Sequence, residues 1–154
     1  MNYWLFKSEP NEFSIEALEK MPRKTEHWDG VRNYQARNFM RDEMRKGELG
    51  FFYHSSCAEP GIVGIIKISK EAYPDHTAFD PTDKHFDPKS DPQAPRWFMV
   101  NVTLVEKFRE PITLKTLKSY ADRQLADFRL LARGNRLSVM PIEKKHWKFI
   151  NSLR

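Results

Sequence analysis

The chain has 154 residues, which suits one domain with one hydrophobic core, so we expect a single domain over residues 1–154. The net charge of +5 is compatible with a polyanionic partner but does not require one. Cys57 is the only cysteine, which excludes an intrachain disulfide, and no apolar run is long enough to span a membrane. The first residues also lack the pattern of a secretory signal, so we expect a cytoplasmic protein.

The first half of the chain predicts two helices and three strands. Residues 3–8 (YWLFKS) predict a strand, and residues 14–20 predict a short helix with a serine as its N-cap. Residues 33–45 predict a second helix, in which basic residues recur every four positions and form a polar stripe. Residues 49–55 and 61–69 then predict strands, because they are rich in β-branched and aromatic side chains.

The second half contains the clearest strand, residues 96–105, in which side chains alternate between a core face and a second face. Leucine and phenylalanine spacing predicts short helices over residues 113–120 and 125–131. Residues 136–142 predict a last strand, and a proline at position 141 opens a C-terminal helix that continues to residue 153.

A long loop separates these halves. Residues 73–96 hold five of the ten prolines, five aspartates and three basic residues, so the loop has a net charge of −2 and the basic character lies outside it. Because the strands cluster in the middle of the chain instead of alternating with helices, a doubly wound parallel sheet is disfavoured. We expect an α+β fold with a small, curved or barrel-like mixed sheet.

The stretch HWDGVRNYQARNF, residues 27–39, combines flat rings with hydrogen-bonding and basic groups. A base can stack on Trp28 or Tyr34, and Asn33 has an amide edge that can read a base. Arginines on the predicted helix stripe can meet phosphates. The residues alone equally allow a buried tryptophan beside an ordinary solvated helix face.

Two strand ends carry other polar groups. Lys7, Ser8 and Glu9 can perform acid–base chemistry if burial shifts their pKa values, although an exposed ion pair is the simpler interpretation. His54 lies between Tyr53 and Ser55, but covalent serine catalysis is disfavoured because adjacent strand residues point to opposite faces.

The long loop also holds potential metal ligands. Their spacing fits no compact metal-binding motif, and a loop of this composition is usually solvated, so we expect no metal. These residues are His76, Asp80, Asp83, His85 and Asp87.

Five stretches, in order along the chain, resemble the EVE domain family. They are YWLFKSEP (3–10), WDGVRNYQARN (28–38), FFYHSSCAEPGIVG (51–64), EAYPDHTAFD (71–80) and RLSVMPI (136–142). The resemblance implies a PUA-like fold, a twisted mixed β-barrel flanked by helices, and a role as a reader of modified bases in DNA or RNA. In the related YTH readers, a Lys-Ser pair and a cage tryptophan occupy places similar to Lys7, Ser8 and Trp28.

From the resemblance and the residues together, we expect a nucleic-acid-binding module, without a cofactor, that holds a flipped and modified base in an aromatic pocket. The expected base-pocket residues are Trp28, Tyr34, Tyr53, Trp97, Lys7, Ser8, Glu9, Asn33, His54 and Ser138. The residues expected to contact phosphates are Arg32, Arg37 and Arg41.

Two alternatives remain at this point. Similarity to ASCH domains implies a hydrolase of a modified nucleoside or base, in which Lys7 and Glu9 form the acid–base pair. The other alternative is a protein-interaction module that uses the basic helix.

Overall fold

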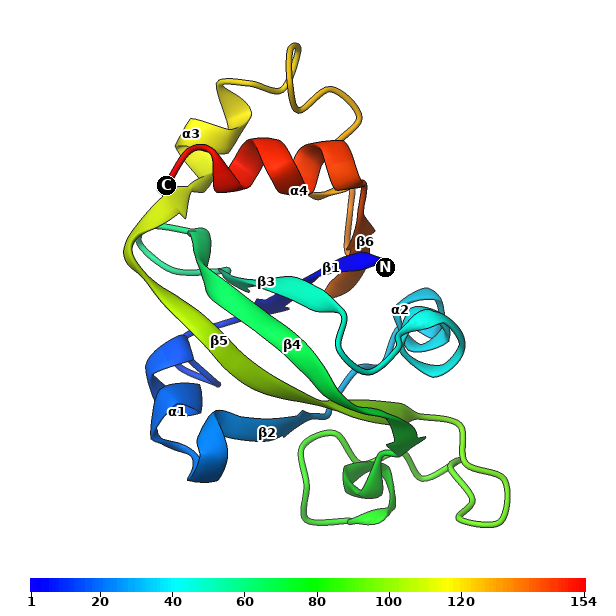
Figure 1. The fold of residues 1–154 in the computed structure, drawn as a ribbon. Coiled ribbons are helices and arrows are strands. Elements are labelled where there is room, and N and C mark those ends of the chain that lie inside the picture. The colour runs from blue at the N-terminus through cyan, green and yellow to red at the C-terminus, as the bar shows by residue number, and fades with distance from the viewer.

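The computed structural model describes residues 1–154 and contains a six-stranded mixed sheet (Figure 1). The strands are β1 (Tyr3–Ser8), β2 (Thr25–Trp28), β3 (Leu49–His54), β4 (Gly61–Pro74), β5 (Phe98–Thr113) and β6 (Val139–Ile142). They lie in the order β2-β5-β4-β3-β1-β6, and every neighbouring pair is antiparallel except β1 and β3, which are parallel. The predicted α+β class is therefore confirmed.

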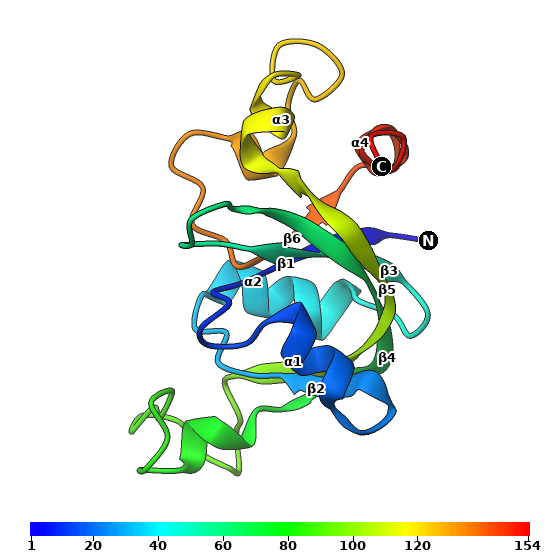
Figure 2. The same ribbon diagram turned by 90° about the vertical axis from the view of Figure 1, so that its left-hand side faces the viewer.

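The sheet is strongly twisted because of its two long central strands. The register between β4 and β5 shifts four times, and such irregularities bend a strand and increase its twist. Figure 2 shows the two strands curving together around the helices inside the sheet. The outermost strands, β2 and β6, do not pair with each other, so the sheet stays open where a closed barrel would join them.

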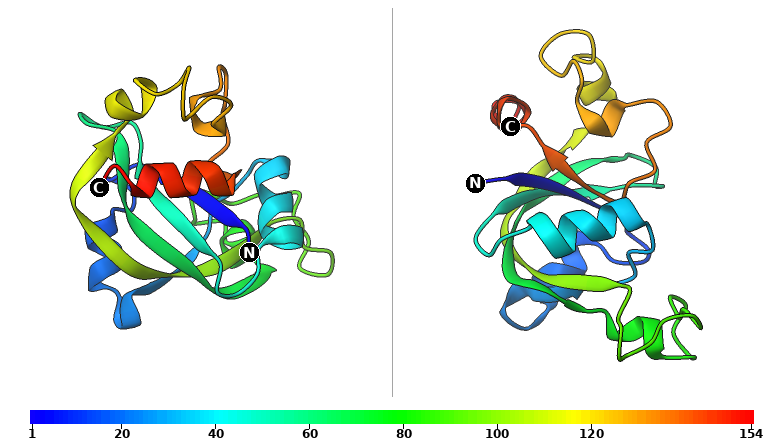
Figure 3. Two further views of the ribbon diagram at one scale, coloured as in Figure 1. Left: turned by 45° about the horizontal axis from the view of Figure 1, so that its top comes forward. Right: turned by 90° about the vertical axis from the view of Figure 1, so that its right-hand side faces the viewer.

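The helices are α1 (Ile15–Lys20), α2 (Tyr34–Asn38), α3 (Leu114–Lys118) and α4 (Lys144–Asn151). The Ser14 hydroxyl accepts a hydrogen bond from Ala17 N–H at 3.0 Å, so this residue caps α1 as predicted. The indole ring of Trp147 stacks on Phe51 of β3 at 4.2 Å, which fixes α4 against the sheet. The segment between β4 and β5 projects beyond the sheet at the end away from α4 (Figures 1 and 3).

The helix predicted over residues 33–45 is shorter in the structure. After α2 the chain forms a single π-helical turn, η2 (Phe39–Glu43), and leaves the helix at Met44, whose backbone is extended. Burying the Met44 side chain directs the following residues away from the helix axis. Arg45 therefore lies outside the helix, and the predicted basic stripe does not continue to it.

Two other predictions fail for local reasons. Residues 125–131 form turns and a short 3₁₀ segment, η4 (Arg129–Leu131), because Asp127 has a φ of +64°, which a right-handed helix cannot contain. Leu125 and Phe128 are nevertheless buried, so the apolar pattern correctly marked core residues. The edge strand β2 was missed because its sequence, TEHW, is mostly polar. No helix is both long and apolar enough to cross a membrane.

Candidate functional site

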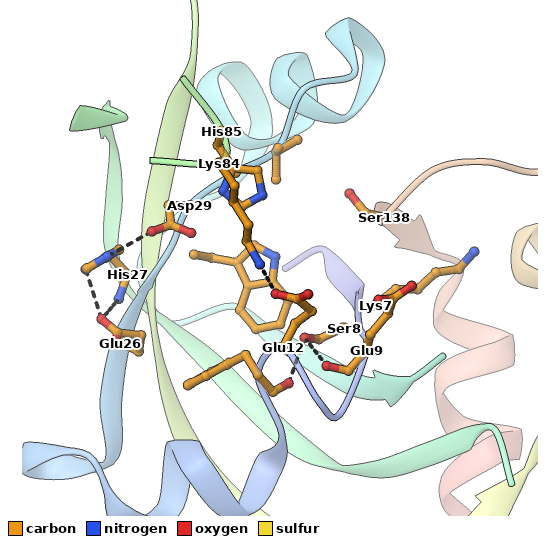
Figure 4. A pocket seen from close by; sticks show the side chains of 14 residues that line it. Lys7, Ser8, Glu9, Glu12, Glu26, His27, Asp29, Lys84, His85 and Ser138 are labelled. Atoms are coloured by element: carbon orange, nitrogen blue, oxygen red, sulfur yellow. Dashed lines mark hydrogen bonds and ion pairs between the residues drawn. The ribbon is translucent and has the colours of Figure 1, made fainter. Parts of the chain in front are cut away.

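A cavity of about 580 Å³ opens where the ends of β1 and β2 meet the β4–β5 segment (Figure 4). Its volume lies in the range of small-molecule sites. The lining residues come from four parts of the chain: Lys7, Ser8, Glu9, Glu12, Phe13, Glu26, His27, Trp28, Asp29, Gly30, Val31, Lys84, His85 and Ser138.

Trp28 gives the cavity its large aromatic surface. Its ring makes edge-to-face contacts with Phe6 at 5.1 Å, Phe52 at 5.4 Å and Phe13 at 6.1 Å, so its orientation is fixed by the core. Trp28 is 7% exposed, so only part of its ring faces the cavity. Its indole N–H is not sealed in the core and makes no hydrogen bond within the protein, so this donor is available to a ligand.

The turn after β2 depends on glycine at position 30. Gly30 has a φ of +78°, and a Cβ placed there would lie 2.5 Å from His85 Cε1. Its N–H donates to Asp75 Oδ2 at 2.9 Å. The positive φ and the close ring both require a residue without a side chain. This close approach brings His85 to the cavity wall.

Asp75 joins that turn to the β4–β5 segment. Its carboxylate is fully buried and accepts hydrogen bonds from Thr77, from Gly30 N–H and from Arg32 Nη1 at 3.0 Å. Burial acts to raise the pKa of Asp75, but the hydrogen bonds and the Arg32 charge outweigh it and hold the pKa below its usual value. Arg32 also donates to the His85 carbonyl at 2.8 Å. Arg32 thus fixes one wall of the cavity and is not a free phosphate ligand.

Acidic groups gather on the β2 side of the cavity. Asp29 Oδ2 lies 3.1 Å from His27 Nε2, and Glu26 Oε1 lies 2.9 Å from His27 Nδ1. Figure 4 shows the three side chains together on one side of the pocket. Burial raises the pKa of Asp29, and the neighbouring His27 opposes that rise. This side therefore offers partly desolvated carboxyl groups as hydrogen-bond acceptors.

The β1 side carries an unpaired cation. Burial lowers the pKa of Lys7, and its ammonium group makes no ion pair or hydrogen bond within the protein. Glu9 also lines the cavity, but no ion pair or hydrogen bond joins the two side chains, so the acid–base pair of the hydrolase alternative is not assembled. The Ser8 hydroxyl donates to the Phe13 carbonyl at 2.7 Å and shapes the turn after β1.

An ion pair crosses the cavity mouth. Lys84 of the β4–β5 segment pairs with Glu12 of the turn after β1, and Figure 4 shows the two side chains meeting. Both side chains are at least half exposed, so the pair contributes little to stability.

Two of the aromatic residues predicted for the pocket lie outside it. Tyr34 and Trp97 stack on each other at 4.8 Å, and Trp97 Nε1 donates to Asp87 Oδ2 at 2.7 Å. Neither residue lines the cavity. The prediction that they complete its walls is wrong, because they fasten the β4–β5 segment to α2 instead.

Three polar candidates are also placed elsewhere. Asn33 Oδ1 accepts a hydrogen bond from Ala36 N–H at 2.9 Å and caps α2. His54 Nε2 accepts from Ile15 N–H at 3.1 Å, and burial lowers its pKa. Tyr53 is 3% exposed and packs in the core. These side chains serve the fold, and the prediction that they line the cavity is wrong for all three.

The other arginines predicted to contact phosphates have internal partners. Arg37 Nη1 donates to the Arg96 carbonyl at 2.7 Å, and its guanidinium lies over the Tyr34 ring at 4.9 Å. Arg41 forms a two-point ion pair with Asp42 on the surface. Phosphate binding at either residue would compete with these contacts.

The aspartates of the β4–β5 segment turn the chain. Asp80, Asp83 and Asp87 accept backbone N–H hydrogen bonds two residues ahead, at 2.8–3.0 Å. No group of three or more histidine, cysteine or acidic side chains is arranged to hold a metal ion.

The five sequence motifs and this fold agree with one family. The model of the EVE domain matches residues 2–153. The chain belongs to the EVE domain family. Human thymocyte nuclear protein 1 is 46% identical over 166 residues, which cover 99% of this chain and 73% of that protein.

Solved structures share the fold of this EVE domain. The crystal structure of the human THYN1 protein in complex with DNA containing 5-methylcytosine has a TM-score of 0.95 and 46% identity, and the match covers 99% of this chain and 97% of that chain. The DUF55 domain of human thymocyte nuclear protein 1 has a TM-score of 0.92 and 49% identity, with coverage of 98% and 97%. The PUA-like fold expected from the motifs is thereby confirmed.

Five of the residues predicted for the base pocket line the cavity of this EVE domain. They are Lys7, Ser8, Glu9, Trp28 and Ser138. The prediction missed nine others: Glu12, Phe13, Glu26, His27, Asp29, Gly30, Val31, Lys84 and His85. The neighbours of Trp28 were recoverable, since they follow it along one strand and turn. No local pattern predicts Lys84 and His85 as cavity residues, because contacts distant in sequence bring their segment to the site, among them Arg32 with Asp75 and with the His85 carbonyl.

Proposed function

We propose that this EVE domain is a DNA-binding module that holds a flipped 5-methylcytosine in the cavity around Trp28. The observation that carries the proposal is a cavity of about 580 Å³ whose lining contains both Trp28, with an unpaired indole N–H, and acceptor carboxyl groups. The relative of the same fold, human THYN1 protein in complex with DNA containing 5-methylcytosine, supports this choice of ligand. Extruding a base costs a few kcal/mol, which contacts inside the cavity must offset.

The polar groups of the cavity match the hydrogen-bonding edge of cytosine. The exocyclic N4 amino group of cytosine is a donor, for which a carboxyl oxygen of Asp29 or Glu26 is a suitable acceptor. The ring N3 and O2 atoms are acceptors, for which the Trp28 N–H is a suitable donor. The lining therefore offers both acceptors and a donor to a base that carries an amino group.

The apolar groups of the cavity suit a methyl group. Phe13, Trp28 and Val31 are the three apolar residues in the lining. Burying one carbon contributes about 0.8 kcal/mol, which corresponds to about a fourfold gain in affinity. The methyl preference expected from contact alone is thus moderate.

The charge of the lining favours a base over a phosphate. Four carboxyl side chains and two lysines line the cavity, and one lysine, Lys84, is paired with Glu12. A phosphodiester placed inside would meet like charge, whereas a neutral base would meet hydrogen-bond acceptors. The base therefore enters the cavity, and the sugar–phosphate backbone of the DNA stays at the cavity rim.

The test is a fluorescence anisotropy titration with labelled duplexes that differ only in one methyl group, at one stated ionic strength. We expect the duplex with 5-methylcytosine to bind about fourfold more tightly than the unmodified duplex. Equal affinities would contradict the proposal. Matched methylated RNA forms a second arm, and tighter binding of RNA would assign the cavity to that polymer. Mass spectrometry of the recovered nucleic acid reports any hydrolysis.

A further inference from the structure

The segment between α3 and β6 reaches the cavity at its end. Ser138 lines the cavity, and its carbonyl accepts a hydrogen bond from Lys7 N–H at 2.7 Å, which ties the segment to β1. Figure 2 shows this segment and the β4–β5 segment on the same side of the molecule, on either side of the end of β1. Two segments therefore border the cavity, one over residues 129–138 and the other over residues 80–91, and we call each of them a rim.

The two rims carry opposite charge. Residues 129–138 contain three arginines and no acidic residue, whereas residues 80–91 contain four aspartates and two lysines. A DNA strand that places one base in the cavity also places its flanking phosphates near the mouth, because each strand carries one phosphate per about 3.4 Å of duplex axis. The basic rim attracts those phosphates and the acidic rim repels them.

Two of the three arginines of the basic rim have free guanidinium groups. Arg133 and Arg136 are exposed and make no hydrogen bond or ion pair within the protein. The Arg129 guanidinium lies over the Phe39 ring at 5.6 Å. The arginines at positions 32, 37 and 41 differ, since all three have partners in the protein. Free guanidinium groups bind phosphate without first losing another contact.

We propose that Arg133 and Arg136 bind the phosphates beside the flipped nucleotide, so that the DNA strand enters over residues 129–138 and not over α2. This inference rests on the proposed function, because that function sets the place of the flipped base. Arg136 is two residues from Ser138, so their Cα atoms lie within about 7 Å. The unpaired Lys7 ammonium lies on the same β1 side and adds positive charge there.

The test compares the salt dependence of DNA binding for wild type, Arg133→Gln/Arg136→Gln and a matched control. The control Lys145→Gln/Lys148→Gln removes two exposed, unpaired charges from α4, which Figure 2 shows on the other side of the molecule. Each phosphate contact contributes about 0.9 to the slope of log K against log salt. We expect the arginine variant to reduce the slope by about 1.8 and the control to leave it unchanged.

The outcomes distinguish a failure of the phosphate-binding role of the arginines from a failure of the proposed function. Titrations use both methylated and unmodified duplexes, and we expect the ratio of the two affinities to be unchanged in the arginine variant. An unchanged slope would overturn the phosphate path, and so would a selective loss of methylated binding. A wild type without methyl preference would contradict the proposed function instead, while the slope on either duplex would still decide the role of the arginines. Equal melting temperatures of the variants exclude misfolding.

Discussion

Two regions of this molecule combine aromatic, basic and hydrogen-bonding side chains, and they differ in what those groups already bind. Around α2, Trp97 donates to Asp87 and Arg37 donates to the Arg96 carbonyl. In the cavity, the Trp28 N–H and the Lys7 ammonium have no partner in the protein. Donors without a partner in the protein are available to a ligand, whereas donors that already hold a partner must first lose it. The α2 region is therefore occupied by internal contacts, whereas the cavity keeps donors free for the ligand that we propose.

The first prediction concerns Arg32→Ala, which we expect to lower the free energy of unfolding more than any other change that we propose. Removing one partner of a buried ion pair costs about 3–5 kcal/mol, because the Asp75 carboxylate stays buried without its cation. Urea unfolding should show a lower midpoint at an unchanged slope. The matched control Arg41→Ala removes a surface ion pair with Asp42 and should stay near wild type. Equal stability of the two variants would place Arg32 among the free surface arginines.

The second prediction addresses the Trp28 indole N–H. Replacing this core ring by alanine would also cost about 3–5 kcal/mol of stability, so Trp28→Phe is the informative change. We expect about a tenfold loss of affinity for methylated DNA, equivalent to one hydrogen bond. Anisotropy titration measures it, with Tyr34→Ser as the control from the α2 region. A larger loss for Tyr34→Ser would reverse the assignment of the two regions.

The third prediction compares one cation from each region. Lys7→Gln should reduce the slope of log K against log salt by about 0.9, because its unpaired ammonium is free to meet a phosphate. Arg37→Gln should change the slope little, since its guanidinium already holds the Arg96 carbonyl. The same reduction in both variants would show that DNA lies over α2 as well.

These regions also show how far the sequence predicts this fold. The positions of β1, α1, β3 and β6 were predicted closely, because each is marked by a local cap, a turn residue or an apolar strand pattern. The stripe of arginines was predicted from periodicity, but periodicity says nothing about partners. The carbonyl of Arg96 reaches Arg37 from 59 residues away, which no local pattern encodes.

Only part of the cavity was predicted from the sequence, because the rest depends on contacts between residues that are distant along the chain. Motif resemblance placed Trp28 and Lys7, which belong to adjacent ends of β1 and β2. The opposite wall comes from the β4–β5 segment, which the buried Asp75 holds in place through Arg32 and Gly30 N–H. An aspartate among five in a proline-rich loop gives no sign that it is the buried one.

The smallest effect concerns Asp29, which lines the cavity, and Asp75, which binds Gly30 and Arg32, because their pKa values shift in opposite directions. Burial raises the pKa of Asp29 above its ordinary value of 3.8, so the fold disfavours its ionised form. That cost is complete above the folded-state pKa and disappears below the ordinary value. Asp29→Asn should therefore raise the free energy of unfolding slightly at neutral pH, and the gain should shrink as the pH falls towards about 4.

Asp75→Asn has the opposite sign and serves as the control. Hydrogen bonds and Arg32 outweigh burial and lower the pKa of Asp75, so its carboxylate stabilises the fold above the unfolded-state pKa and loses that contribution as the pH falls through the folded-state value. Urea midpoints at neutral and acid pH give both differences. Stabilisation by Asp29→Asn together with weaker DNA binding would mean that this carboxylate is retained for the ligand at a cost to the fold. Destabilisation at neutral pH would instead make Asp29 a structural residue like Asp75.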